Sequence, residues 1–103
     1  MPSTEDPNDP RLKKIKENGQ QEAYVVLSEE ERAKGFVRPY RATYKHLACG
    51  TTTTMGPAIS ETYAKKPDFY GATFCVACKD HFNLKTADGH AFEWVPDGTP
   101  VGD

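Results

Sequence analysis

The sequence contains no apolar stretch that approaches a membrane span, and no hydrophobic segment follows its first residues, Met1-Pro2-Ser3-Thr4-Glu5-Asp6. A spanning helix needs about 20 mostly apolar residues, and a secretory signal needs an apolar stretch close to the N-terminus. Membrane insertion and secretion are therefore unsupported, and we expect a cytoplasmic protein.

Cysteine is scarce, with three in 103 residues. An odd and small number of cysteines does not fit a disulfide framework, whereas thiols that are kept reduced in the cytoplasm can bind metal. The sequence also lacks a phosphate-cradling glycine loop and a serine-nucleophile motif, so it offers no sign of those two enzyme classes.

Aliphatic residues are few at the start of the chain, where residues 1–22 combine three prolines and mixed charge with only Leu12 and Ile15. Such a segment cannot bury enough apolar surface to offset its ordering entropy. We interpret residues 1–22 as a flexible charged tail, with a short partner-bound helix as the alternative. Residues 97–103 are expected to be a flexible C-terminus. Residues 23–96 then form one domain, small enough for a structural metal to decide whether it folds.

Two close pairs of metal-ligand residues lie within that domain. His46 and Cys49 are three positions apart, as are Cys75 and Cys78. Two ligands at this spacing on a tight turn can face one ion, and the second pair completes a tetrahedron. Three thiolates and one imidazole suit Zn²⁺, and four protein ligands leave no open position, which is typical of a structural site. His81 is the competing fourth ligand, and three free cysteines with an unrelated histidine are the simpler alternative.

The apolar pattern around the two pairs predicts a mixed α and β structure. Ser28 begins a short helix that Gly35 ends, and Pro57 begins a second helix that Pro67 stops. Strands are expected at 23–27, at 36–44, at 69–74, and in a hairpin whose arms are 81–85 and 91–95, joined through Asp88-Gly89. The hairpin should place four apolar side chains on one face: Phe82, Leu84, Phe92 and Trp94. The prediction is a small α+β, zinc-ribbon-like module with a helix inserted between the ligand pairs and a C-terminal β-hairpin.

Several blocks of the sequence also resemble a group of small uncharacterised proteins of bacteriophages and prophages. The blocks are Gly35-Phe36-Val37-Arg38-Pro39, Tyr44-Lys45-His46 through Cys49-Gly50, Thr54-Met55-Gly56, and Glu61-Thr62-Tyr63-Ala64 through Phe69-Tyr70-Gly71-Ala72-Thr73-Phe74-Cys75. The resemblance covers roughly residues 24–95. It implies a phage or mobile-element origin, hence the host cytoplasm, and the same four ligands, but it carries no activity that can be transferred.

Enzyme chemistry finds little support in the sequence. A zinc deaminase needs a glutamate two residues after the ligand histidine, and Ala48 stands there instead. A nuclease of the histidine-asparagine-histidine type, built from His81, Asn83 and His90, lacks the helix that would follow its hairpin. Thiolates committed to zinc are poor nucleophiles. We therefore expect a non-enzymatic protein.

Binding is the better-supported class of function. From Arg32 to Lys45 the chain carries five basic residues and no acidic one, interleaved with Phe36, Tyr40 and Tyr44. This stripe is able to bind nucleic acid, although the net charge of −2 provides no field that attracts a polyanion. A solvated strand face is equally compatible. We favour a protein partner, such as a host defence complex that the protein inhibits or modulates. The candidate contact residues are Arg38, Tyr40, Arg41, Tyr44, Phe69 and Tyr70.

Overall fold

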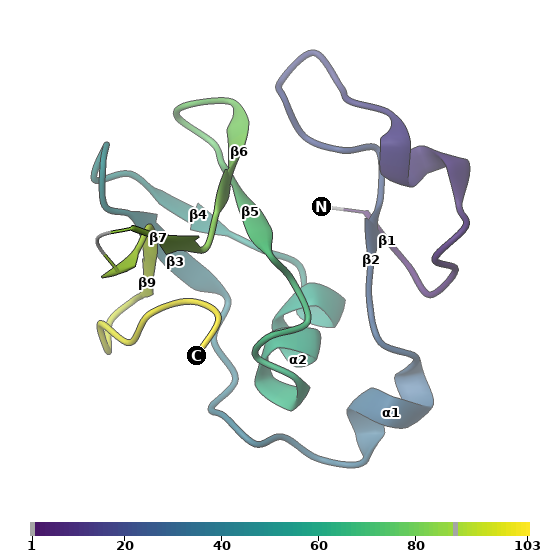
Figure 1. Ribbon diagram of the computed structural model, residues 1–103. Coiled ribbons are helices and arrows are strands. Elements are labelled where there is room, and N and C mark those ends of the chain that lie inside the picture. Colours follow the sequence, from purple (N-terminus) through teal and green to yellow (C-terminus); the bar gives the residue numbers. More distant parts are fainter. Residues whose placement is uncertain (1, 88) are drawn as a thin grey trace.

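The structure, a computed structural model, describes residues 2–87 and 89–103 and has the predicted small α+β architecture. Three strands form one antiparallel sheet in the order β4-β3-β9, with bounds Thr43–His46 for β3, Thr52–Thr54 for β4 and Phe92–Trp94 for β9. The helix α2, Pro57–Lys65, connects β4 to β5, Ala72–Cys75. The helix therefore lies between the two ligand pairs in sequence, as predicted (Figure 1).

The remaining strands form three small pairs. β5 is antiparallel to β6, Asp80–Asn83, and β7, Lys85–Thr86, is antiparallel to β8, Gly89–His90. β1, Ser3–Thr4, is parallel to β2, Tyr24–Val25, and a short helix α1, Glu29–Ala33, follows β2. Among the described residues, no helix is long and apolar enough to cross a membrane.

The C-terminal hairpin is confirmed as the antiparallel pair β7 and β8, but the expected long arms were wrong. Residues of the first arm pair with β5 through β6, and residues of the second pair with β3 through β9. The turn includes Asp88, which lies outside the described residues. The four apolar side chains nevertheless meet, because Phe82 packs against the same core cluster that contains Leu84, Phe92 and Trp94. These side chains are buried together because two sheets meet around them. The two arms do not pair with each other.

One hydrophobic core lies between α2 and the three-stranded sheet. Met55, Ile59 and Tyr63, predicted as an apolar stripe of the second helix, are all buried, but only Ile59 and Tyr63 lie on α2, since Met55 precedes its first residue. Tyr63 packs edge-on against Trp94, with 5.3 Å between ring centroids. The core therefore extends from α2 across the sheet to the strand that carries His46, so that folding of the core and positioning of the first ligand pair are coupled.

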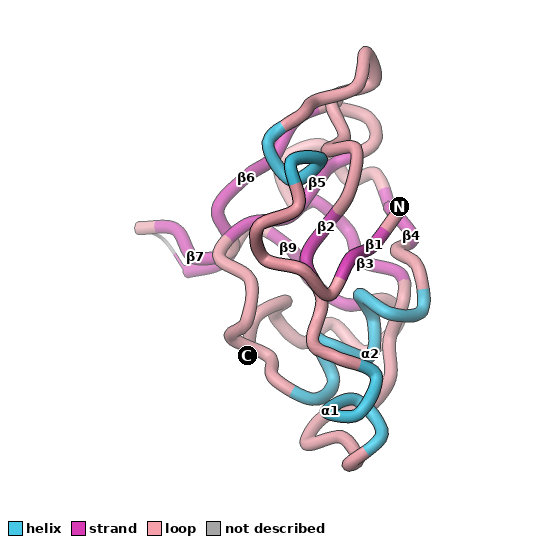
Figure 2. The backbone as a smooth tube through the Cα atoms, turned by 90° about the vertical axis from the view of Figure 1, so that its right-hand side faces the viewer, coloured by secondary structure: helices cyan, strands magenta, loops and turns pink. Residues whose placement is uncertain are grey.

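Residues 2–22, which we call the N-terminal arm, pack over one side of the domain (Figure 2). The arm contains β1 and a 3-10 turn, Pro10–Lys13, and none of its side chains is buried. A bridge between Ile15 and Gln21 closes its second half into a loop. The composition-based prediction of a flexible tail stays a prediction, because these contacts give the arm a place in the structure without measuring its mobility.

Candidate metal centre

The four predicted ligands meet at one point in the structure. Ligand atoms of His46, Cys49, Cys75 and Cys78 all lie within 4.8 Å of one another. The Sγ of Cys49 is 3.5 Å from that of Cys75 and 3.4 Å from Nδ1 of His46, and the Sγ of Cys78 is 3.7 Å from the same nitrogen. A tetrahedron with metal–sulfur bonds of about 2.3 Å and a metal–nitrogen bond of about 2.0 Å has edges of about 3.5 to 3.8 Å. The group can hold a metal ion with little rearrangement.

The two ligand turns have the same backbone construction. The N–H of Gly50 donates to the carbonyl of His46 at 2.7 Å, and the N–H of Lys79 donates to that of Cys75 at 2.8 Å. The residue after the second ligand is left-handed in both turns, with φ of 74° at Gly50 and 55° at Lys79. Glycine adopts this conformation freely, whereas lysine pays a steric cost. The first turn could be predicted from Gly50. Nothing in the sequence indicated the left-handed backbone at Lys79.

This difference between the turns predicts opposite effects of two substitutions. We expect Gly50→Ala to destabilise the metal-loaded protein by about 1 kcal/mol and Lys79→Gly to stabilise it by about 0.5–1 kcal/mol, since each changes the cost of a left-handed residue. Chemical denaturation at a fixed metal concentration measures both, because unfolding is linked to metal release. A Gly50→Ala protein as stable as the unmodified chain would contradict the left-handed turn.

His46 is held in place by stacking on two aromatic rings. Its imidazole is buried between Phe82 and Phe92, with ring centroids at 4.5 and 4.7 Å and small interplanar angles. This stacking fixes the ring plane, and with it the direction of Nδ1. Cys75 is also buried, whereas Cys49 and Cys78 are exposed. Each pair thus contributes one ligand from the core and one from the surface.

The thiols have different acidities because of their immediate partners. A hydrogen bond from the backbone of Thr51 lowers the pKa of Cys49 to about 6. Hydrogen bonding to Cys75, together with desolvation, raises the pKa of Cys78 to about 11. Adjacent thiolates repel one another in the absence of a cation, and a bound divalent ion reverses this by favouring every thiolate.

The competing histidine is not part of the cluster. Nε2 of His81 lies 2.8 Å from the hydroxyl of Tyr24, and partial burial lowers the pKa of His81. His90 pairs with Glu93 at 2.9 Å. The structure therefore places His46, rather than His81, with the three thiols. Sequence reasoning missed the contact between Tyr24 and His81, which joins segments 57 positions apart and leaves no local signal.

The predicted contact residues divide into surface and interior positions. Arg38 and Tyr40 are exposed. Tyr44, however, is completely buried, and its hydroxyl donates to the carbonyl of Phe74. It belongs to the core, so its prediction as a contact residue was wrong. Its place in β3, where alternate side chains face inward, is the reason.

Arg41 also turns inward. Its side chain is only 10% exposed, forms an ion pair with Asp97 at 3.0 Å, and lies 4.8 Å from the centroid of the Trp94 ring. Phe69 and Tyr70 are half-buried, with rings 4.9 Å apart, and the hydroxyl of Tyr70 donates to the carbonyl of Val25. These three residues have structural partners that the sequence did not reveal.

The opposite behaviour of Tyr44 and Tyr40 gives a matched test. Tyr44→Phe removes the partner of the Phe74 carbonyl and of the Thr73 hydroxyl, which lies 3.2 Å from the Tyr44 oxygen. We expect it to cost about 1–2 kcal/mol, whereas Tyr40→Phe at an exposed position should change stability by less than about 0.5 kcal/mol. Thermal denaturation of both variants checks this prediction. Equal stabilities would mean that the Tyr44 hydroxyl is exposed, as a contact residue requires.

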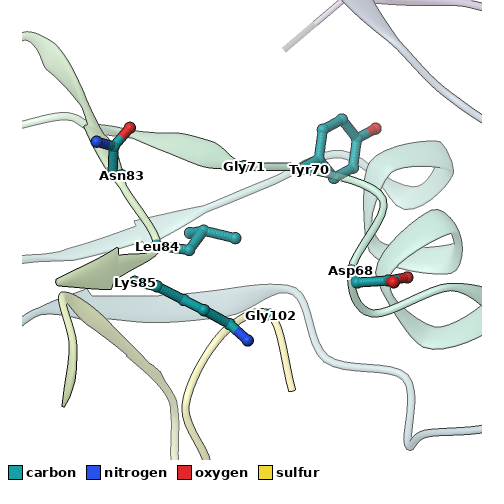
Figure 3. Close-up of a pocket in the computed structure, with 7 residues that line it drawn as sticks. All are labelled: Asp68, Tyr70, Gly71, Asn83, Leu84, Lys85 and Gly102. Atoms are coloured by element: carbon teal, nitrogen blue, oxygen red, sulfur yellow. The ribbon is translucent and has the colours of Figure 1, made fainter.

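A hollow of about 330 Å³ lies away from the metal ligands, between the start of β5 and the C-terminal residues (Figure 3). It is lined by Asp68, Tyr70, Gly71, Asn83, Leu84, Lys85 and Gly102. Asp68, Asn83 and Lys85 are exposed, and the Tyr70 hydroxyl is engaged elsewhere. The hollow therefore offers no buried, unpaired polar group to orient a ligand, which leaves the His/Cys cluster as the best-defined candidate site.

No protein-family model, no curated protein and no solved structure matches this chain. The function must be argued from the residues themselves.

Proposed function

We propose that the protein is a zinc-stabilised, non-enzymatic interaction module. Zn²⁺ is the ion that best suits three thiolates and one imidazole at tetrahedral spacing. Four protein ligands fill its coordination sphere, so the ion has no position left for substrate or water. Its role is to tie the strand that carries His46 to the strand that carries Cys75. With this linkage the domain would be the zinc-ribbon-like module expected from its sequence.

The observation that supports a binding role is the exposed segment from Gly35 to Tyr40. All its residues are exposed, including the large apolar side chains of Phe36, Val37 and Tyr40 at 42%, 59% and 49%. The amides of Val37 and Arg38 both donate to the carbonyl of Ala64, at 2.9 and 3.0 Å, which fixes the segment at the end of α2. Aromatic and arginine side chains presented from a fixed backbone are typical anchors of protein interfaces. We assign the segment to a protein partner, which for a phage protein would be a host complex such as a defence assembly.

Nucleic-acid binding is the second candidate and has weaker support. The basic stripe that suggested it is partly neutralised, because Lys34 pairs with Glu31 at 2.8 Å and Arg41 pairs with Asp97. The nuclease alternative is weaker still, since His81 and His90 have separate hydrogen-bond partners, Tyr24 and Glu93.

The deciding experiment is a pull-down from host lysate with the tagged, zinc-loaded protein, with and without nuclease. The unmodified chain is compared with a Phe36→Ala, Tyr40→Ala variant and with Ile15→Ala, a control at an apolar residue of the arm that is even more exposed, at 59%. We expect a discrete protein that survives nuclease, is lost with the double variant and is retained with the control. Nuclease-sensitive recovery would favour nucleic acid, and less than about one zinc per chain would remove the premise.

A further inference from the structure

β2 makes contacts with the domain that do not involve the N-terminal arm. Ala23 and Val26, the residues that flank β2 on either side, are both buried. The carbonyl of Val25 accepts the Tyr70 hydroxyl, and the N–H of Leu27 donates to the hydroxyl of Thr62 at 3.2 Å. These contacts come from α2 and from the segment before β5. β2 should therefore keep its place when the arm leaves it.

Among the described residues, the arm is the segment that pairs with the other edge of β2. The amides of Tyr24 and Val26 donate to the carbonyls of Pro2 and Thr4, at 2.9 and 2.8 Å, in a parallel pairing of two residues. Because none of the arm's side chains is buried, this pairing has little hydrophobic support. When the arm leaves, the amides of Tyr24 and Val26 become free. An edge strand with free amides is a template for pairing with another extended segment.

A cationic side chain stands beside this edge. The Nε of Arg32 donates to the carbonyl of Leu27 at 3.0 Å, and its Nη1 pairs with Glu61 at 2.7 Å, so the guanidinium is held by the domain. Its Nη2 lies 3.7 Å from the carboxylate of Glu5, which also accepts a hydrogen bond from the amide of Glu29 at 3.1 Å. The arm thus occupies the edge with an extended backbone followed by a carboxylate.

We infer that the outer edge of β2, with Arg32, is a docking site for an extended acidic segment of a partner protein, which the N-terminal arm fills until the partner displaces it. This inference rests on the proposed interaction function and names the chemistry of the partner. Backbone pairing supplies affinity in such strand addition, and side-chain contacts supply selectivity. The arm shows which chemistry fits: two residues that pair with β2, then a carboxylate that reaches Arg32. Displacement exchanges equivalent backbone hydrogen bonds and withdraws no buried side chain of the arm.

The test uses the full-length, zinc-loaded protein and two acetylated peptides, one with the sequence of residues 2–7 and one in which the glutamate of that sequence is replaced by glutamine. Titrations are followed through the backbone amide resonances of Tyr24 and Val26. We expect saturable binding, about threefold tighter for the acidic peptide because a partly exposed ion pair contributes little more. Glu5→Gln, which weakens the resident arm, should tighten binding of the acidic peptide. Glu17→Gln, the same change at an exposed arm residue whose side chain makes no hydrogen bond or ion pair with the described residues, should not.

Three results would overturn the site: no saturable binding to the Glu5→Gln protein, equal affinity for both peptides, or resonance changes confined to other strands. All of these variants keep Arg32. A change in peptide affinity therefore cannot come from the loss of its contacts with Leu27 and Glu61. A partner recovered in the pull-down that excess acidic peptide fails to release would also overturn the site, while the proposed interaction function would stand. Release of the partner by the acidic peptide, and not by the peptide that carries glutamine, would support both the docking site and the proposed interaction function.

Discussion

Removal of the metal by a chelator is expected to abolish the cooperative unfolding transition of this protein. Two ligands, His46 and Cys75, are part of the buried core, and they join β3 to β5 across the site. Zinc binding by small domains contributes about 10–16 kcal/mol of apparent free energy, which is comparable with the whole stability of about 5–15 kcal/mol of a typical domain. The apo protein should therefore lose its ordered near-ultraviolet circular dichroism and regain it when zinc is restored.

Two histidine substitutions sharpen this expectation. His46→Asn should reduce zinc content well below one ion per chain and destabilise the fold, because it removes a ligand and the ring that stacks between Phe82 and Phe92. His81→Asn is the matched control, since the His81 side chain is hydrogen-bonded to Tyr24 and lies outside the His/Cys cluster. Elemental analysis and circular dichroism of both variants provide the measurement.

Contradictory outcomes are equally clear. A chelated chain that still unfolds cooperatively would show that the core is sufficient without metal. If the His81→Asn protein lost zinc and the His46→Asn protein kept it, His81 would be the ligand in place of His46, and the geometry of the site would be wrong.

The ligand set was predictable because each pair is encoded locally. A three-residue spacing fixes the turn, and the turn directs both side chains to one side whatever the rest of the chain does. The apolar face of α2 was predictable for the same reason: Ile59 and Tyr63 are four positions apart on one helix and share one of its faces. What remained for the structure was how the two turns approach each other.

Strand pairing was not predictable from local pattern. The alternating residues around Phe82 and Phe92 fit a hairpin, yet they equally fit two strands that share a core while pairing elsewhere. Alternation specifies which side chains face inward and leaves the partner strand open. The same limit applies to the predicted contact surface, where Tyr44 and Arg41 found partners far along the chain, in Phe74 and Asp97.

Composition predicts a flexible N-terminal arm, and one glycine provides a test of that prediction. Gly19 has φ of +90°, and a Cβ atom built there would lie 1.9 Å from the backbone oxygen of Lys79, next to the last ligand Cys78. Real Cβ atoms do not approach a carbonyl oxygen this closely, so a side chain at this position must displace the arm or the metal turn. A flexible tail, by contrast, would accept any residue there.

Gly19→Ala is therefore expected to release the arm from the second metal turn. The left-handed backbone alone costs about 1 kcal/mol, and the overlap with Lys79 adds a cost that only undocking relieves. Gly35→Ala is the matched control, because Gly35 also has a positive φ, of +104°, but a Cβ there would meet nothing within 4 Å. Hydrogen exchange should show faster exchange at Tyr24 and Val26, whose amides pair with the arm, in the Gly19 variant and not in the control. Equal exchange in both variants would mean that the arm does not dock against Lys79, and that composition alone describes residues 2–22 correctly.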